Sequence, residues 1–165
     1  MAKVITFSTK FPHYHPRAGQ PTYFVEKFWK AFPYEKTGKI PGHPAAIMIV
    51  DFDFYESCLP KHHTIRAGHR FKKGDYFSPR VWSGKPYNSP QITIAPDTLI
   101  TDVYDFVIDP LFTGDIYING ILIDITTIEN VAKNDGLNID DFYNWFNYPK
   151  PFNGQIICWN ENIKY

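Results

Sequence analysis

Six consecutive residues near the middle of the chain combine side chains that nucleophilic chemistry requires. They are Lys61-His62-His63-Thr64-Ile65-Arg66. A threonine hydroxyl is a weak nucleophile until a base takes its proton, and a lysine can act as that base only where burial or positive charge lowers its pKa. If His63 to Arg66 form a strand, Thr64 and Arg66 project from one face, where the arginine can hold a carbonyl or phosphate. Taken alone, the same residues also fit an exposed lysine and a β-branched strand residue.

The charges around this segment are unevenly distributed, although the net charge of the chain is zero. Residues 61–85 contain seven basic residues and one acid, whereas residues 97–145 contain ten acids and one basic residue. This asymmetry predicts a local positive field that suits phosphate groups. An intramolecular match between the two charged segments explains it equally well. The basic residues are Lys61, Arg66, Arg70, Lys72, Lys73, Arg80 and Lys85.

The composition predicts one domain of a protein that stays in the cytoplasm. The chain has 165 residues, of which 44% are hydrophobic and 18% aromatic, enough for a real core. No run approaches the roughly 18 apolar residues of a membrane span, and the first residues do not resemble a signal peptide. Cys58 and Cys158 lack metal-like spacing and are expected to be small buried residues. The histidines form no HxxxH pattern, so neither a metal nor another cofactor is expected.

The elements before the Lys61 segment are a strand and an aromatic helix. Val4 to Phe7 is expected to form a short strand, and Pro21 can open a helix. Glycine and proline break the chain from Tyr34 to Pro44, and the apolar run at 45–50 fits either a buried strand or the start of a helix. The helix carries an apolar face at three- and four-residue spacing that is assigned to the core: Phe24, Val25, Phe28, Trp29 and Phe32.

The elements after the Lys61 segment are mainly strands. Strands are expected at 76–82, 91–95, 99–108 and 155–159. Asn119-Gly120 between DIYI and ILID predicts a two-residue hairpin with a type I′ turn. Thr126 or Thr127 can cap a helix that runs to about Asn134 and ends at Gly136, and Asn138 can cap another through Phe146. The order of elements favours an α+β fold with a largely antiparallel, closed sheet.

Lys61, the Thr64-Ile65-Arg66 strand and the following Gly74-Asp75 together resemble the signature of ASCH domains, which belong to the PUA-like superfamily. The likeness is greatest to small bacterial amidohydrolases that remove an acyl group from the exocyclic amine of acetylated cytidine. It implies a PUA-like, mostly antiparallel β-barrel flanked by helices. The chain differs from those enzymes by an insertion between its first helix and Lys61, residues 33–60, and by additions around the sequence WSGKPY.

The resemblance implies a role for each matching residue. Lys61 falls at the family's catalytic lysine, Thr64 at its threonine nucleophile, Arg66 at the arginine of the motif, and Asp135 at the acid, where the enzymes carry glutamate. Asp135 would act as general acid or base for the leaving amine. Aspartate is one methylene shorter, and a displacement of about an ångström can cost roughly a hundredfold in rate.

A binding module that performs no chemistry is the alternative function. Aromatic side chains stack on unpaired bases while lysine and arginine follow the phosphates. The partner would then be a modified nucleoside or single-stranded RNA, bound by residues of the basic segment and the WSGKPY sequence. A third alternative is a structural subunit joined through exposed aromatic side chains. The expected binding residues are Arg66, Arg70, Trp82, Lys85 and Tyr87.

Overall fold

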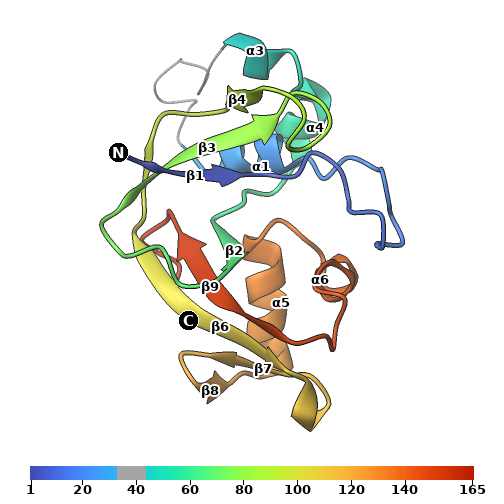
Figure 1. Ribbon diagram of the computed structural model, residues 1–165, viewed down its shortest axis with the longest axis vertical. Coiled ribbons are helices and arrows are strands. Elements are labelled where there is room, and N and C mark those ends of the chain that lie inside the picture. Colours follow the sequence, from blue (N-terminus) through green and yellow to red (C-terminus); the bar gives the residue numbers. More distant parts are fainter. Residues whose placement is uncertain (33–43) are drawn as a thin grey trace.

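The strands of the chain form two sheets (Figure 1). The computed structural model describes residues 1–32 and 44–165, and within these residues no strand ladder joins the two sheets into a closed barrel. The class is α+β, as predicted, and every ladder except β1 with β3 is antiparallel. The predicted break at Tyr34 to Pro44 lies almost entirely outside the described residues.

The first sheet has the order β1-β3-β4, and β5 also pairs with β3. In the parallel β1–β3 ladder, Thr6 lies opposite Arg80, and the Phe7 amide donates to the Arg80 carbonyl at 2.7 Å. Figure 1 shows the short helices α3 and α4 on the same side of the molecule as this sheet. The elements are β1 (Lys3–Thr6), β3 (Tyr76–Trp82), β4 (Gln91–Thr93), β5 (Thr98–Leu99), α1 (Phe24–Lys30), α3 (Pro44–Ile47) and α4 (Phe52–Ser57).

The second sheet has the order β2-β9-β6-β7-β8, and α5 and α6 pack beside it (Figure 1). Its β7–β8 hairpin turns at Asn119 and Gly120, whose φ values of 50° and 78° are both positive, as the predicted type I′ turn requires. A short 3-10 turn at 110–112 follows β6. The elements are β2 (His63–Ala67), β6 (Asp102–Asp109), β7 (Asp115–Ile118), β8 (Ile121–Leu122), β9 (Phe152–Cys158), α5 (Ile125–Asn134) and α6 (Ile139–Trp145).

An aromatic core lies between α1 and the two sheets. The ring of Trp159, which follows β9, lies 5.0 Å from that of Phe28 in α1, 5.6 Å from Phe77 in β3 and 6.0 Å from Phe7. The Trp159 indole N–H donates to the Lys61 carbonyl at 3.0 Å, so its polar atom is satisfied within the core. The predicted apolar face of α1 is therefore confirmed as core, with Phe24, Val25, Phe28 and Trp29 all buried.

Several element boundaries differ from the predictions for local reasons. Helix α5 is capped by Asp124, whose carboxylate accepts from the Thr127 amide at 2.8 Å, and not by Thr126 or Thr127 as predicted. Asn138 does cap α6, by accepting from the Asp141 amide at 2.7 Å. The strand predicted at 99–108 divides into β5 and β6, because Thr101 leaves the first ladder and donates to Cys158 in the second sheet. The ambiguous apolar run at 45–50 begins as helix α3.

The two cysteines are free and buried, as the sequence predicts. Cys58 follows α4, and Cys158 is the last residue of β9. Across the ranges 1–32 and 44–165, no helix has the length and hydropathy that crossing a membrane requires.

Candidate functional site

A buried ion pair joins Lys61 to Asp135. The Lys61 ammonium donates both to the carboxylate and to the backbone carbonyl of Asp135. The two side chains are only 1% and 7% exposed, and the ammonium lies 4.4 Å from the centre of the Phe24 ring. The structure thus brings together the two residues that the sequence predicts as base and acid. We call Lys61, Thr64, Arg66 and Asp135 the Lys61 centre.

The ion pair also completes the carboxyl end of helix α5. The last carbonyls of a helix have no partner within it and attract positive charge. Here the Asn134 carbonyl accepts from the His62 amide at 2.8 Å, the Asp135 carbonyl accepts from Lys61, and the Gly136 carbonyl accepts from the Lys27 ammonium at 2.7 Å. The helix end therefore positions Asp135, and part of the role of Lys61 is structural.

Burial shifts the pKa values of both partners toward the neutral forms. It lowers the pKa of the Lys61 ammonium to about 8, although the attraction of Asp135 opposes this effect. Burial likewise raises the pKa of the Asp135 carboxyl group, against the opposing charge of Lys61. A lysine with a pKa near 8 has an appreciable neutral fraction close to neutral pH, as a general base requires.

Thr64 follows Lys61 closely in the sequence, but no hydrogen bond among the described residues connects its side chain to the ion pair. Its side chain is buried in β2, where it lies opposite Ile157 of β9. No hydrogen bond connects the Thr64 hydroxyl to Lys61, Asp135 or any other residue within 1–32 and 44–165. The predicted nucleophile therefore has no hydrogen-bonded base in this structure.

Arg66 reaches from β2 to the first sheet. Its Nη2 donates to the Thr6 carbonyl at 2.7 Å, and its guanidinium lies 5.6 Å from the Phe7 ring. The Nε atom is buried without a hydrogen-bond partner. Burial lowers the pKa of Arg66, and Asp135, Arg70 and Tyr87 lie near enough to influence it electrostatically. Arg66 therefore connects the ion pair with the predicted binding residues.

The predicted binding residues beyond Arg66 lie in two loops. Arg70 donates to the Val4 carbonyl at 3.0 Å and covers the Phe71 ring. Trp82 ends β3, and the ring of Tyr87 packs on it with 5.3 Å between centroids. Lys85 is exposed in the loop that carries Tyr87, and its carbonyl accepts from the Ser89 hydroxyl at 3.0 Å. Arg70 and Tyr87 each lie near enough to act on the charge of Arg66. The hydrogen bonds of Lys85 to described residues stay within its own loop.

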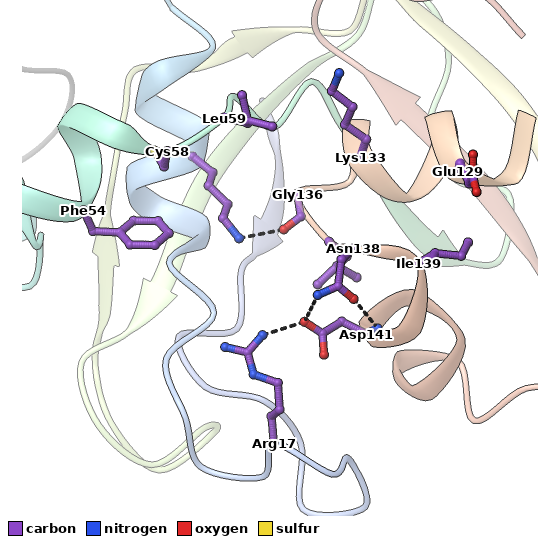
Figure 2. Close-up of a pocket in the computed structure, with 12 residues that line it drawn as sticks. Arg17, Phe54, Cys58, Leu59, Glu129, Lys133, Gly136, Asn138, Ile139 and Asp141 are labelled. Atoms are coloured by element: carbon purple, nitrogen blue, oxygen red, sulfur yellow. Dashed lines mark hydrogen bonds and ion pairs between the residues drawn. The ribbon is translucent and has the colours of Figure 1, made fainter. Parts of the chain in front are cut away.

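An open pocket of about 480 Å³ is lined in part by Gly136, on the side of this residue away from Lys61 (Figure 2). Phe54, Cys58 and Leu59 lie at one wall, and Asn138 and Ile139 at the opposite wall. Gly136 separates this pocket from Lys61, since a methyl group placed on Gly136 would lie 3.4 Å from the Lys61 Cβ. The pocket therefore approaches the Lys61 centre without including its ion pair.

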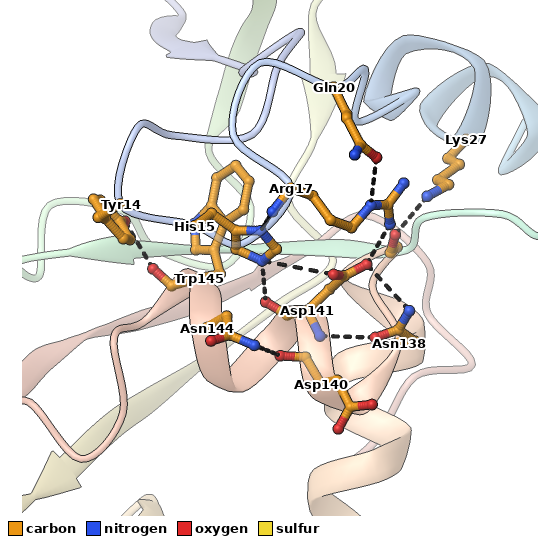
Figure 3. A network of polar contacts seen from close by, with 11 residues as sticks. Tyr14, His15, Arg17, Gln20, Lys27, Asn138, Asp140, Asp141, Asn144 and Trp145 are labelled. Atoms are coloured by element: carbon orange, nitrogen blue, oxygen red, sulfur yellow. Dashed lines mark hydrogen bonds and ion pairs between the residues drawn. The ribbon is translucent and has the colours of Figure 1, made fainter.

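Sequence reasoning missed a second polar network, which joins the segment before α1 to helix α6 (Figure 3). Arg17 Nη1 donates to Asp141 at 2.6 Å, and the same carboxylate oxygen accepts from Asn138 at 3.1 Å. His15 Nδ1 accepts from the Arg17 amide at 3.0 Å, so the ring proton lies on Nε2, which is 3.2 Å from the Asp141 carbonyl. We call His15, Arg17, Asn138 and Asp141 the Arg17 clamp.

The sequence gives little indication of two contacts made by the N-terminal part of the chain, the Arg17 clamp and the hydrogen bond from Lys27 to Gly136. The partners of the Arg17 clamp are more than 120 positions apart, and no local pattern links residues at such a separation. Lys27 was detectable in part, because it interrupts the apolar face formed by Phe24 and Phe28. A cation on a buried helix face indicates a partner, although not which one.

The opposite charges predicted to match within the chain do so only in part. Lys61 pairs with Asp135, and Lys73 lies 3.4 Å from Asp102. The arginines of the basic segment take no part in these contacts. Comparisons of the chain with protein-family models, with curated proteins and with solved structures gave no match.

Proposed function

We propose that the protein hydrolyses an acyl amide on the exocyclic amine of a cytidine-like nucleobase at the Lys61 centre. One observation carries the proposal: a fully buried lysine has its pKa lowered to about 8 beside an aspartate with a raised pKa. Pairs of titratable groups with perturbed pKa values are frequent at catalytic sites. The motif resemblance to ASCH amidohydrolases, and to the PUA-like superfamily more broadly, supplies the substrate class.

The proposed chemistry has two steps. Neutral Lys61 takes the proton of the Thr64 hydroxyl as its oxygen attacks the acyl carbon, and the C–N bond breaks as the leaving amine receives a proton from Asp135 or from the Lys61 ammonium. Water then hydrolyses the Thr64 ester to release the carboxylic acid. Because Lys61 donates to Asp135 in this structure, substrate binding must bring its amine within reach of Thr64.

The test is the release of cytidine from acetylated and longer acylated cytidines, followed by absorbance and chromatography. We expect turnover by the wild type and by Lys72→Ala, which removes an exposed lysine of the same basic segment. Lys61→Ala should lower turnover by about 10²- to 10⁴-fold, the usual contribution of a general base. Undiminished turnover in a folded Lys61→Ala protein would exclude the assigned role.

A loss of activity through unfolding has to be separated from a loss of chemistry. Replacing the whole pair, in Lys61→Met with Asp135→Leu, removes both charges and retains apolar volume. We expect this double variant to fold and to be inactive. Turnover by the folded double variant would contradict the proposal.

Passive binding of an unpaired base is the second candidate, and the Trp82–Tyr87 pair favours it. Tyr87 is 87% exposed, and its ring packs on Trp82 beside the arginines of the basic segment. An unpaired base stacked on an exposed aromatic contributes about 1–3 kcal/mol. A fluorescent single-stranded RNA should then bind more weakly to Trp82→Ala, and binding should weaken as salt rises. RNA affinity unaffected by both changes would exclude this candidate.

A further inference from the structure

Three of the four arginines lack an acidic partner. Arg17 pairs with Asp141, but Arg66, Arg70 and Arg80 form no ion pair with a carboxylate anywhere within residues 1–32 and 44–165. Among the described residues, the Arg80 side chain hydrogen-bonds to the neutral side chains of Ser78 and Gln91. This absence is unexpected in a neutral chain with as many acids as basic residues. Asp135 influences Arg66 without forming an ion pair, so none of the three guanidinium groups is bound to a carboxylate of the described residues.

Arg66 and Arg70 lie next to each other along strand β1. Arg66 donates to the carbonyl of Thr6 and Arg70 to that of Val4, two residues earlier. Because β1 pairs with β3 alone among the described strands, both arginines reach it outside that ladder. These contacts explain how the two guanidinium groups are held at fixed positions.

The two arginines form few hydrogen bonds within the part of the chain that the structure describes. A guanidinium carries five N–H donors. Arg66 and Arg70 each make one hydrogen bond to the described residues, and Arg66 Nε is buried with none. Arg70 is exposed and Arg66 is partly exposed, so guanidinium donors other than the buried Nε can reach an anionic ligand. Tyr87 lies near enough to Arg66 to influence its charge.

We infer that Arg66 and Arg70 bind a phosphate monoester, so that the substrate is a nucleotide and not an uncharged nucleoside. The inference rests on the proposed function and names the substrate class of the same site. A phosphate monoester carries close to two negative charges and accepts paired hydrogen bonds from planar guanidinium groups. Two neighbouring arginines without acidic partners match both properties.

The base would then extend from this phosphate toward the Lys61 centre. Arg66 belongs both to the inferred phosphate site and to the Lys61 centre. Thr64 and Arg66 project from the same face of β2, and the charge of Asp135 acts on Arg66. The Trp82–Tyr87 pair lies beside the same arginine and offers an aromatic surface to the ligand.

The test compares ligands that differ only in the phosphate. Calorimetric titration of the full chain with cytidine and with cytidine 5′-monophosphate should give a Kd at least about tenfold lower for the nucleotide. Arg66→Gln should abolish this difference, and Lys73→Gln should retain it. Lys73 belongs to the same basic segment but pairs with Asp102, so its loss removes equal charge outside the inferred site. Arg70→Gln, which alters an exposed residue, provides the second variant if Arg66→Gln does not fold.

The outcomes separate this inference from the proposed function. Equal affinity of the wild type for nucleoside and nucleotide would overturn the phosphate site, and so would equal turnover of acylated cytidine and its 5′-monophosphate. Turnover of neither, with tight nucleotide binding that depends on Arg66, would overturn the hydrolase and keep the phosphate site. A phosphorylated RNA end that binds about tenfold more tightly than the mononucleotide would show that the monoester belongs to RNA and overturn the assignment to a free nucleotide.

Discussion

The Lys61 centre and the Arg17 clamp use similar groups in opposite ways. The Lys61 centre joins Lys61, just before β2, to Asp135 at the end of α5. The Arg17 clamp joins Arg17, in the segment before α1, to Asp141 in α6. In the Arg17 clamp the Asp141 carboxylate accepts from Arg17 and Asn138, and Arg17 remains 40% exposed. In the Lys61 centre both charges are buried, both pKa values are shifted, and the neighbouring Arg66 has an unpaired donor. A satisfied network stabilises the fold, whereas buried groups with shifted pKa values are frequent at catalytic sites, which is the basis of the proposed function.

The largest difference between the two regions is expected in stability. Lys61→Met leaves Asp135 buried without its partner and should lower the free energy of unfolding by about 3–5 kcal/mol at pH 7. Arg17→Met should cost only about 1 kcal/mol, because the arginine is partly solvated. Urea unfolding followed by tryptophan fluorescence measures both.

The double variant Lys61→Met with Asp135→Leu is the control for that measurement. Replacing a whole buried pair by apolar residues is often neutral or stabilising, so most of the loss should be recovered. If Lys61→Met alone has no effect, the pair is solvated in solution and the contrast with the Arg17 clamp fails.

The titration of Lys61 gives the second contrast. Its ammonium should lose its proton with a midpoint at about pH 8, well below the value for an exposed lysine. Asp135→Asn removes the charge and the hydrogen bond that raise the Lys61 pKa, so the midpoint should fall further. NMR detection of the lysine side chains across a pH series measures this, and Asp141→Asn is the matched control that should leave the midpoint unchanged.

The sign of the accompanying stability change follows from the same shift. The folded-state pKa of Lys61 lies below its unfolded value of 10.5, so between about pH 8 and 10.5 the unfolded chain binds more protons at this site. This lysine should therefore make the free energy of unfolding rise with pH across that window. The rise should be absent in the variant Lys61→Met with Asp135→Leu.

A smaller effect is expected from breaking the Arg17 clamp at its carboxylate. Asp141→Ala removes the acceptor for Arg17 and Asn138 and should cost about 1–3 kcal/mol, because hydrogen bonds to a charged carboxylate are lost. Proteolysis of the segment before α1 should accelerate, because Arg17 loses its attachment to α6. Turnover and nucleotide affinity should stay unchanged per folded molecule, and a specific loss of either would place the clamp in the functional site.

Local sequence signals predicted the elements better than the site. The Asn119-Gly120 turn, the Asn138 cap and the 76–82 strand depend on neighbouring residues, and the structure confirms them. The Lys61–Asp135 contact came from a motif resemblance, and the structure places the two residues together. The Arg17 clamp and the separation into two sheets depend on contacts between distant segments, which one sequence without a motif does not specify.

Gly136 lies where the two regions meet, and its replacement tests whether they are independent. Its φ of 80° favours glycine, and an added methyl group would lie 3.2 Å from Lys27 Cδ and 3.4 Å from Lys61 Cβ. Gly136→Ala should lower the free energy of unfolding by about 1 kcal/mol, measured by urea unfolding. The methyl group crowds the stem of Lys27, whose charge acts on Lys61, and none of the three atoms nearest to it belongs to Arg17. The Lys61 titration midpoint should therefore move, while Asp141→Ala should retain its cost in the Gly136→Ala background. A cost of Asp141→Ala that changes in this background would instead show that the two regions act as one network.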